Sequence, residues 1–334
     1  MKHLNFEKTI LSIHKEIQVK LKKTNKKIDN YIQSDVPLIP QLSSYFFNKR
    51  GKQLRPVLCL LSSKMINEDY SKLTSDISMA AALEFIHAAT LLHDDVIDKG
   101  KSRRGQRSIN DIWNNKFSVL LGDFMFSKSF QLMTEGQSLK AMESLAEVSG
   151  KISEGEFLQM ANENNTSLTI SDYLQIISLK TAELFGAAMK IPAILTKKSN
   201  KMIKQLNLIG LNFGMIFQII DDHLDYFGTI KTGKVKGKDF FEGKITLPII
   251  FLFKKTTPTE KKWLLKILKN KKRSKKDFLQ TKVLLEKYDI ERLSLKYAND
   301  LKHKSKVVLK TFKNQPSILL QELLDTSINR DNKS

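Results

Sequence analysis

This sequence of 334 residues has little glycine, little proline and a single cysteine. Its 14 glycines and seven prolines are too few for the many tight turns of an all-β protein. The lone cysteine, Cys59, excludes a disulfide within the chain and fits a reducing compartment, for which we expect the cytoplasm. Cys59 lies in the apolar run 57–61, so we expect its thiol in the core.

The sequence also lacks a secretory signal and a long apolar run. Residues 1–8 have neither the apolar stretch nor the small-residue cleavage site of a signal peptide. The longest apolar run, residues 245–253, is interrupted by Thr246 and Pro248 and is too short to span a bilayer. Apolar residues recur instead every three to four positions in a chain that is 41% apolar. This pattern predicts amphipathic helices and a large core.

Positive charge predominates, with 56 Lys and Arg residues, 35 Asp and Glu residues and a formal net charge of +21. Such an excess raises the question of a polyanionic partner. The lysines are spread along the whole chain, and the densest basic run, residues 269–276, contains no aromatic residue for base stacking. We therefore expect no nucleic-acid partner and only a weak attraction to an anionic membrane surface.

No Pro-rich or Ser-rich linker divides the chain. Residues 1–45 predict one N-terminal helix and a loop, with Pro37 and Pro40 as breakers. A glycine- and lysine-rich loop is expected over 228–243, and a disordered tail over 330–334. Helical periodicity is expected over the stretches 56–195, 201–227 and 244–329. We therefore predict one all-α domain over residues 1–334, a bundle of helices around a central cavity.

One acidic pattern occurs twice, and it is the most specific feature of the chain. In a helix, positions i and i+4 share a face, so the first and last aspartates of each copy point the same way. Clustered carboxylates repel one another, and a hard divalent cation removes that repulsion. Mg2+ suits oxygen ligands and also holds substrate phosphates. The repeat therefore predicts two facing walls around a diphosphate, formed by Asp94, Asp95 and Asp98 and by Asp221, Asp222 and Asp225.

Basic and polar residues near these aspartates have the chemistry of phosphate binding. Arg103 and Arg104 follow the first copy and offer bidentate guanidinium groups. His87 lies two helical turns before Asp94, on roughly the same face. Further candidate donors to phosphate, or dipoles toward a cation, are Lys52, Arg55, Lys180, Thr181, Gln218, Lys234 and Lys244.

Taken together, these segments resemble the trans-polyprenyl diphosphate synthases of the all-α isoprenoid synthase family. The resemblance extends from about Gly51 to Pro248 and includes both acidic patterns. Two positions depart from the family pattern: Arg50 stands where glycine is frequent, and Lys238 where a smaller or acidic residue is commoner. Neither departure removes an expected ligand. The segments that carry the resemblance are 91–98, 103–105, 122–124, 154–156, 180–182, 217–225 and 242–248.

The resemblance implies a homodimeric prenyltransferase that adds isopentenyl diphosphate repeatedly, head to tail, to an allylic diphosphate, with about three Mg2+ per active site. The implied metal ligands are Asp94, Asp98, Asp221 and Asp225, and the implied catalytic groups are all six aspartates with Arg103 and Lys180. The implied site for isopentenyl diphosphate consists of Lys52, Arg55, His87 and Arg104. The implied site for the allylic diphosphate consists of Arg103, Lys180, Thr181, Gln218, Lys234 and Lys244.

Product length is expected to depend on the side chains beneath the first acidic pattern. Ala89 and Thr90, five and four residues before Asp94, are small, whereas aromatic residues there form the floor in short-chain members of the family. A tunnel along the preceding helix then favours a long product of about eight isoprene units, as in quinone side chains.

Three alternatives remain. The first is a synthase of farnesyl or geranylgeranyl diphosphate. The second is a non-catalytic subunit of a heteromeric synthase, in which broken acidic patterns would be tolerated. The third is a terpene cyclase, in which the arginine pair is not expected.

Overall fold

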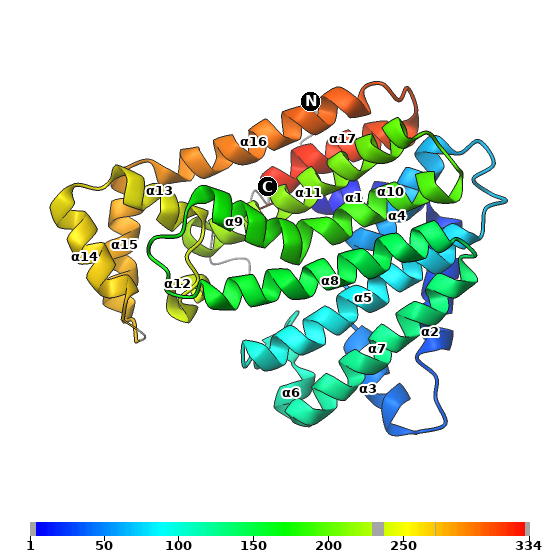
Figure 1. The fold of residues 1–334 in the computed structure, drawn as a ribbon, viewed down its shortest axis with the longest axis horizontal. Coiled ribbons are helices and arrows are strands. Elements are labelled where there is room, and N and C mark those ends of the chain that lie inside the picture. Colours follow the sequence, from blue (N-terminus) through cyan, green and yellow to red (C-terminus); the bar gives the residue numbers. More distant parts are fainter. Residues whose placement is uncertain (1–4, 229–236, 271, 331–334) are drawn as a thin grey trace.

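The structure, a computed structural model, describes residues 5–228, 237–270 and 272–330. Over these ranges nearly all regular structure is helical, and the strands are a single short antiparallel pair (Figure 1). The prediction of an all-α fold is confirmed. The N-terminal half contains α1 (Phe6–Glu16), α2 (Gln18–Tyr31), α3 (Leu38–Phe47), α4 (Leu54–Ile66), α5 (Ser75–Ile97), β1 (Ser102–Arg103), β2 (Gln106–Arg107), α6 (Ile109–Ile112), α7 (Asn115–Glu135) and α8 (Leu139–Ala161).

The second half continues the bundle and ends in a projecting helical pair, α14 and α15, followed by two returning helices. The loop expected over 228–243 contains a short helix, α12, and residues 229–236 of it lie outside the described ranges. The elements are α9 (Ile170–Ile177), the π-helix η1 (Ser178–Ala182), α10 (Glu183–Leu195), α11 (Asn200–Phe227), α12 (Lys238–Glu242), α13 (Leu247–Lys255), α14 (Pro258–Leu268), α15 (Lys275–Lys287), α16 (Ile290–Leu309) and α17 (Gln315–Ile328).

Both ends of the chain differ from the prediction. The segment expected as one helix and a loop contains α1, α2 and α3, and Pro40 lies in the first turn of α3. A proline is compatible with that position because a backbone N–H there has no partner within the helix. At the other end, Arg330 was expected in a disordered tail, yet its guanidinium group donates to the carbonyl oxygen of Phe217 at 2.7 Å. Residues 331–334 lie outside the described ranges.

Helix α5 forms the centre of the bundle. It packs against α4 and α7, and it is apolar on nearly all sides over most of its length, as expected of a helix surrounded by protein. By length and composition, α5 and α11 could each cross a membrane, although the run 245–253 is too short to do so. Of the most apolar window, 78% is buried inside the protein in α5 and 50% in α11. Core helices meet the same criteria, so this is weak evidence for a membrane span. The two acidic patterns lie near the C-terminal ends of α5 and α11.

Candidate active site

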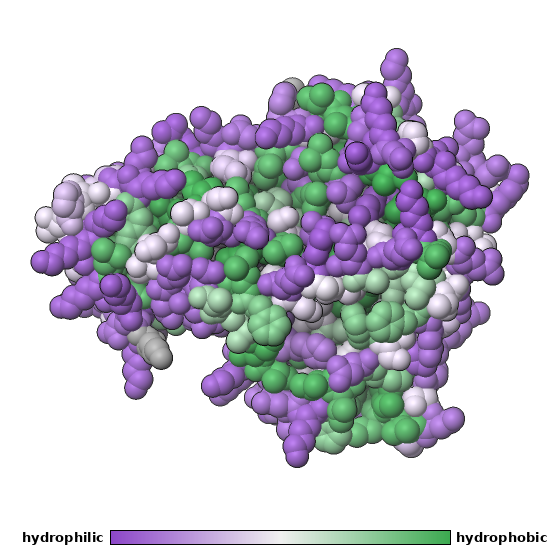
Figure 2. All heavy atoms as spheres, viewed as in Figure 1, coloured by the Kyte–Doolittle hydropathy of each residue, from purple (hydrophilic) through white to green (hydrophobic). Residues whose placement is uncertain are grey.

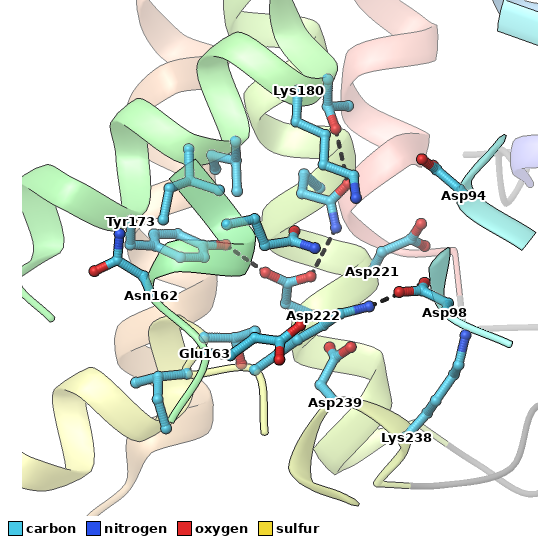
Figure 3. A pocket seen from close by; sticks show the side chains of 18 of the residues that line it. Asp94, Asp98, Asn162, Glu163, Tyr173, Lys180, Asp221, Asp222, Lys238 and Asp239 are labelled. Carbon is cyan, nitrogen blue, oxygen red and sulfur yellow. Dashed lines mark hydrogen bonds and ion pairs between the residues drawn. The ribbon is translucent and has the colours of Figure 1, made fainter. Parts of the chain in front are cut away.

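Both acidic patterns face one cavity of about 320 Å3. Asp94 and Asp98 enter it from α5, whereas Asp221 and Asp222 enter from α11 on the opposite wall (Figure 3). Lys180 comes from η1, and Asp239 comes from α12. The structure therefore brings together two carboxylate walls that lie more than 100 residues apart in the sequence.

On the α5 wall, the carboxylates are supported by positively charged side chains. Asp95 is buried and accepts two hydrogen bonds from Arg103, from Nε and Nη2, at 2.8 Å each. Asp98 accepts one from Lys244 Nζ at 3.2 Å. Asp94 and Asp98 are the aspartates of this pattern that line the cavity, because Asp95 is turned toward Arg103.

On the α11 wall, the support is mostly neutral. Asp222 accepts hydrogen bonds from the hydroxyl of Tyr173 at 2.6 Å and from Gln218 Nε2 at 2.8 Å. Asp225 accepts the backbone N–H groups of Lys238 and Asp239 at 3.0 Å each, and so fixes the start of α12. Asp221 Oδ1 lies 3.4 Å from Arg330 Nη1.

Burial and mutual repulsion make these carboxylates hard to ionise. Burial, with a smaller effect of the charges of Glu156 and Asp98 and against the effect of Lys180, raises the pKa of Asp94 to about 6. Burial likewise raises the pKa of Asp222 to about 7, and the charges of Asp221 and Asp225 act in the same direction. Positive charge placed between the walls would relieve this repulsion.

The oxygen-only donor set fits a divalent metal of the Mg2+ type. Within the described ranges, no three His, Cys, Asp or Glu side chains already form a ready-made metal site. This agrees with a cation that keeps several waters and shares its coordination with substrate phosphates. Four aspartates of the two acidic patterns, Asp94, Asp98, Asp221 and Asp222, line the cavity and could hold such an ion, and the carboxylates of Glu163 and Asp239 line it as well.

A π-helix presents Lys180 and Thr181 to the cavity. Short π-helical insertions occur frequently at functional sites because they widen the helix by one residue. Thr181 Oγ1 donates to Gln218 Oε1 at 3.2 Å, and Gln218 in turn donates to Asp222. Lys180 forms an ion pair with Glu156 of α8. Two of the predicted residues thus belong to one hydrogen-bonded network with the second acidic pattern.

A second basic cluster lies beside α5. The strands β1 and β2 form a hairpin whose two loop residues, Arg104 and Gly105, both have positive φ, as in a type I′ turn. Arg104 donates to the carbonyl oxygen of Lys49 at 2.7 Å and lies so close to Gly51 that a Cβ there would be 2.9 Å from its Cζ. Gly51 also has a φ of +66°, a backbone conformation that favours glycine at this position.

Arg55 and His87 complete this cluster. The Arg55 guanidinium lies 4.3 Å from the centre of the Phe185 ring, and burial lowers its pKa to about 10. Burial lowers the pKa of His87 well below its ordinary value, and the charges of Arg55 and Arg104 add to that effect. The predicted partner Lys52 is exposed, and its Nζ lies 4.5 Å from the centre of the Phe6 ring of α1.

Several site residues had no signal of their own in the sequence. Tyr173 and Arg330 contact cavity residues only because distant helices meet there. Glu156 lies in segment 154–156, which carried the resemblance, but its ion pair with Lys180 was not predicted. Asp239 lines the cavity, and burial raises its pKa well above the ordinary value; its place after the second acidic pattern was the one available hint. The predicted ligand Lys234 lies outside the described residues.

The sequence profile described as Polyprenyl synthetase matches residues 36–284, about three quarters of the chain. This chain belongs to the polyprenyl synthetase family. It is therefore an enzyme, a trans-prenyltransferase, and the family's synthases use a divalent metal. The resemblance read from the sequence is confirmed.

Relatives in the family differ in product. The chain is 40% identical to the octaprenyl diphosphate synthase of Escherichia coli over 71% of this chain and 72% of that protein. It is 33% identical to the geranylgeranyl diphosphate synthase of Saccharolobus solfataricus over 84% of both chains. A polyprenyl synthase from Caulobacter crescentus, solved with calcium and isoprenyl diphosphate, shares the fold with a TM-score of 0.89 and 36% identity, covering 96% of this chain and 98% of that one.

A mainly apolar groove of this polyprenyl synthetase lies between α5 and α8 beside the first acidic pattern, and it is open to the surface, since Phe157 (75% exposed) and Met160 (47%) line it. Its volume is about 220 Å3, and it adjoins Asp94 and Lys180. Thr90 lines it together with Ile152, Phe157 and Met160, while Ala89 is buried in the adjoining core. Of the two residues expected to control product length, Thr90 therefore borders this groove, whereas Ala89 lies in the core.

Proposed function

We propose that this enzyme elongates an allylic diphosphate with isopentenyl diphosphate to an all-trans product of about eight isoprene units (about C40) for quinone side chains. The observation that carries the proposal is that small side chains, Ala89 and Thr90, precede Asp94, where Thr90 lines a mainly apolar groove. No aromatic floor stands at these two positions. Both acidic patterns are complete, which argues against a non-catalytic subunit.

The carboxylates and cations of the main cavity bind the allylic diphosphate in this proposal. Asp94, Asp98, Asp221 and Asp222 hold Mg2+, about three ions per site by family resemblance, with Asp225 fixing the α12 end of the wall. The metal supplies positive charge for the departing diphosphate. Lys180, Arg103 and Lys244 line the same cavity and donate to the diphosphate oxygens.

The second substrate binds beside this site. Arg55, His87 and Arg104, with Lys52, form a basic wall for the diphosphate of isopentenyl diphosphate, and guanidinium groups suit it because they bind phosphate bidentately. Thr181 and Gln218 direct oxygen dipoles toward the allylic cation. Apolar walls exclude water, which would otherwise trap that cation. The proton released at the end passes to the diphosphate, and no side chain is assigned as base.

The first test measures product length. Enzyme is incubated with labelled isopentenyl diphosphate, farnesyl diphosphate and Mg2+, and the dephosphorylated lipids are sized. We expect products near C40 from the wild type, and mainly C20 to C25 from Thr90→Phe and Ala89→Phe, because a ring fills the space beside the diphosphate. Thr90→Val, which keeps the volume, is the matched control. An unchanged product profile in both Phe variants contradicts the role given to these positions.

A homodimer is part of the proposal, supported by an apolar surface on α7 and α8. Figure 2 shows apolar side chains gathered over the area that these helices occupy in Figure 1. They include Leu120 (62% exposed), Phe157 (75%) and Leu139 (72%). Apolar patches of this kind mark interaction surfaces, and C2 dimers are the commonest oligomers. A cytoplasmic location and weak membrane attraction remain predictions.

Light scattering coupled to size-exclusion chromatography tests the dimer. We expect twice the chain mass for the wild type and a monomer for the double variant Leu120→Glu/Phe157→Glu. A matched pair on another face, Leu279→Glu/Val283→Glu on α15, should leave the mass unchanged. A monomeric wild type contradicts the proposal.

A further inference from the structure

Lys180 is paired with a carboxylate that belongs to neither acidic pattern. Its ammonium group forms an ion pair with Glu156 of α8, and the two side chains are only 20% and 14% exposed. The adjacent Gly155 brings the two backbones together, since a Cβ at Gly155 would lie 2.5 Å from the backbone nitrogen of Lys180. Packing of α8 against η1 therefore fixes this pair, unlike a flexible pair at the surface.

The pair stands at the border between the main cavity and the mainly apolar groove. Lys180 lines both of them, and Glu156 and Asp94 line the groove with it. The charges of Lys180 and Glu156 act on Asp94 in opposite directions. Both charges are therefore close enough to Asp94 to influence it.

Asp94 differs in this respect from its neighbours. Asp95, Asp98 and Asp221 each have a cationic side chain directly against the carboxylate: Arg103, Lys244 and Arg330. Lys180, the cation whose charge has the largest effect on Asp94, forms its ion pair with Glu156 instead. A lysine ammonium is a compact charge on a flexible stem, so without Glu156 it has the reach to turn to another carboxylate.

We propose that Glu156 is a positioning residue that holds the Lys180 ammonium group away from Asp94. The oxygens of Asp94 then remain available to the divalent cation before any diphosphate arrives. Lys180 at the same time stays at the cavity edge, where the diphosphate of the allylic substrate reaches it. This inference rests on the proposed metal-binding role of Asp94. An ammonium group paired with Asp94 would compete with the metal for the same oxygens.

The test measures Mn2+ binding by calorimetry in the absence of substrate and turnover. Four proteins form a double-mutant cycle: wild type, Glu156→Gln, Lys180→Met and the double variant. We expect Glu156→Gln to weaken Mn2+ binding about tenfold, because Lys180 moves to Asp94. In the Lys180→Met background, the same Glu156→Gln change should alter binding less than about twofold.

A matched control is Glu147→Gln, which removes the exposed Glu147–Lys151 pair from the same helix and should leave Mn2+ binding unchanged. Equal effects of Glu156→Gln with and without Lys180 overturn the proposal, as does the absence of Mn2+ binding by the wild type. A wrong metal site can be distinguished from a wrong positioning role. If Asp94 does not bind the metal, Asp94→Asn binds Mn2+ like the wild type. If Asp94→Asn loses binding and Glu156→Gln does not, only the positioning role is wrong.

Discussion

The two acidic patterns have the same spacing, but the fold supports their carboxylates differently. On α5, the partners are charged: Arg103 holds Asp95 through two hydrogen bonds, and Lys244 reaches Asp98. On α11, the partners of Asp222 are the neutral Tyr173 and Gln218, and those of Asp225 are backbone N–H groups. Charged partners neutralise a carboxylate, whereas neutral donors orient it and leave its charge in place.

The aspartates that face the cavity differ accordingly. The α5 pattern presents its first and last members, Asp94 and Asp98, whereas the α11 pattern presents its first two, Asp221 and Asp222. Helical spacing predicts the first arrangement and not the second. The repeated pattern therefore identifies where metal is expected, while tertiary contacts decide which oxygens are offered.

The largest expected effect comes from removing a cavity-facing carboxylate from each wall in turn. Asp94→Ala and Asp221→Ala should each lower kcat/KM by about 10³, because a metal contributes several kcal/mol to the leaving diphosphate. The measurement is initial-rate kinetics with isopentenyl and farnesyl diphosphates at saturating Mg2+. Asp300→Ala, on the exposed face of α16, is the control. If only one wall is sensitive, the two patterns are not equivalent metal sites.

The neutral support on α11 is tested by Tyr173→Phe. Loss of the hydroxyl removes the shortest hydrogen bond to Asp222, and we expect a 10- to 100-fold loss of kcat together with a higher Mg2+ requirement. Tyr297→Phe, on α16 away from the cavity, should behave like the wild type. Wild-type kinetics for Tyr173→Phe would mean that Gln218 alone orients Asp222.

Much of the fold, and part of the difference between the two acidic patterns, could be predicted from the sequence. Apolar spacing predicted the helices, and the i, i+4 rule correctly placed Asp94 and Asp98 on one face because both lie within or at the end of one helix. The same rule places Asp225 with Asp221, and its role as a metal ligand stays a prediction; its oxygens accept two backbone N–H groups of α12, a contact that the spacing did not predict. Tyr173 and Arg330 were invisible because their contacts depend on how separate helices pack, which local patterns do not encode.

The raised pKa of Asp94 predicts a cost in stability when no metal is bound. The pKa rises from 3.8 in the unfolded reference to about 6 in the fold, so the folded state binds this proton more tightly. The contribution of Asp94 to the free energy of unfolding is then fully present below pH 3.8 and is lost as the pH rises through about 6. Above that range, the ionised group opposes folding.

Asp94→Asn should therefore stabilise the metal-free protein by roughly 2 kcal/mol at pH 8, a value reduced for the partial exposure of the group. Urea unfolding in EDTA measures it, and the gain should shrink as the pH is lowered toward 4. Asp123→Asn, at an exposed carboxylate of α7, is the control. A gain that does not depend on pH would show that charge is not the cause.

The smallest effect is expected at Thr181, the member of the Thr181–Gln218–Asp222 hydrogen-bonded network that lies farthest from the carboxylate. Thr181 reaches Asp222 only through Gln218, and its hydrogen bond to Gln218 Oε1 is long at 3.2 Å. Thr181→Val keeps the side-chain shape and should lower kcat about three- to tenfold, the range for one neutral hydrogen bond. Thr181→Ser, which keeps the hydroxyl, should recover most of that loss. If Thr181→Val lowers kcat as much as Tyr173→Phe, which removes a direct hydrogen bond to Asp222, the Thr181 hydroxyl acts on the substrate and not only through Gln218.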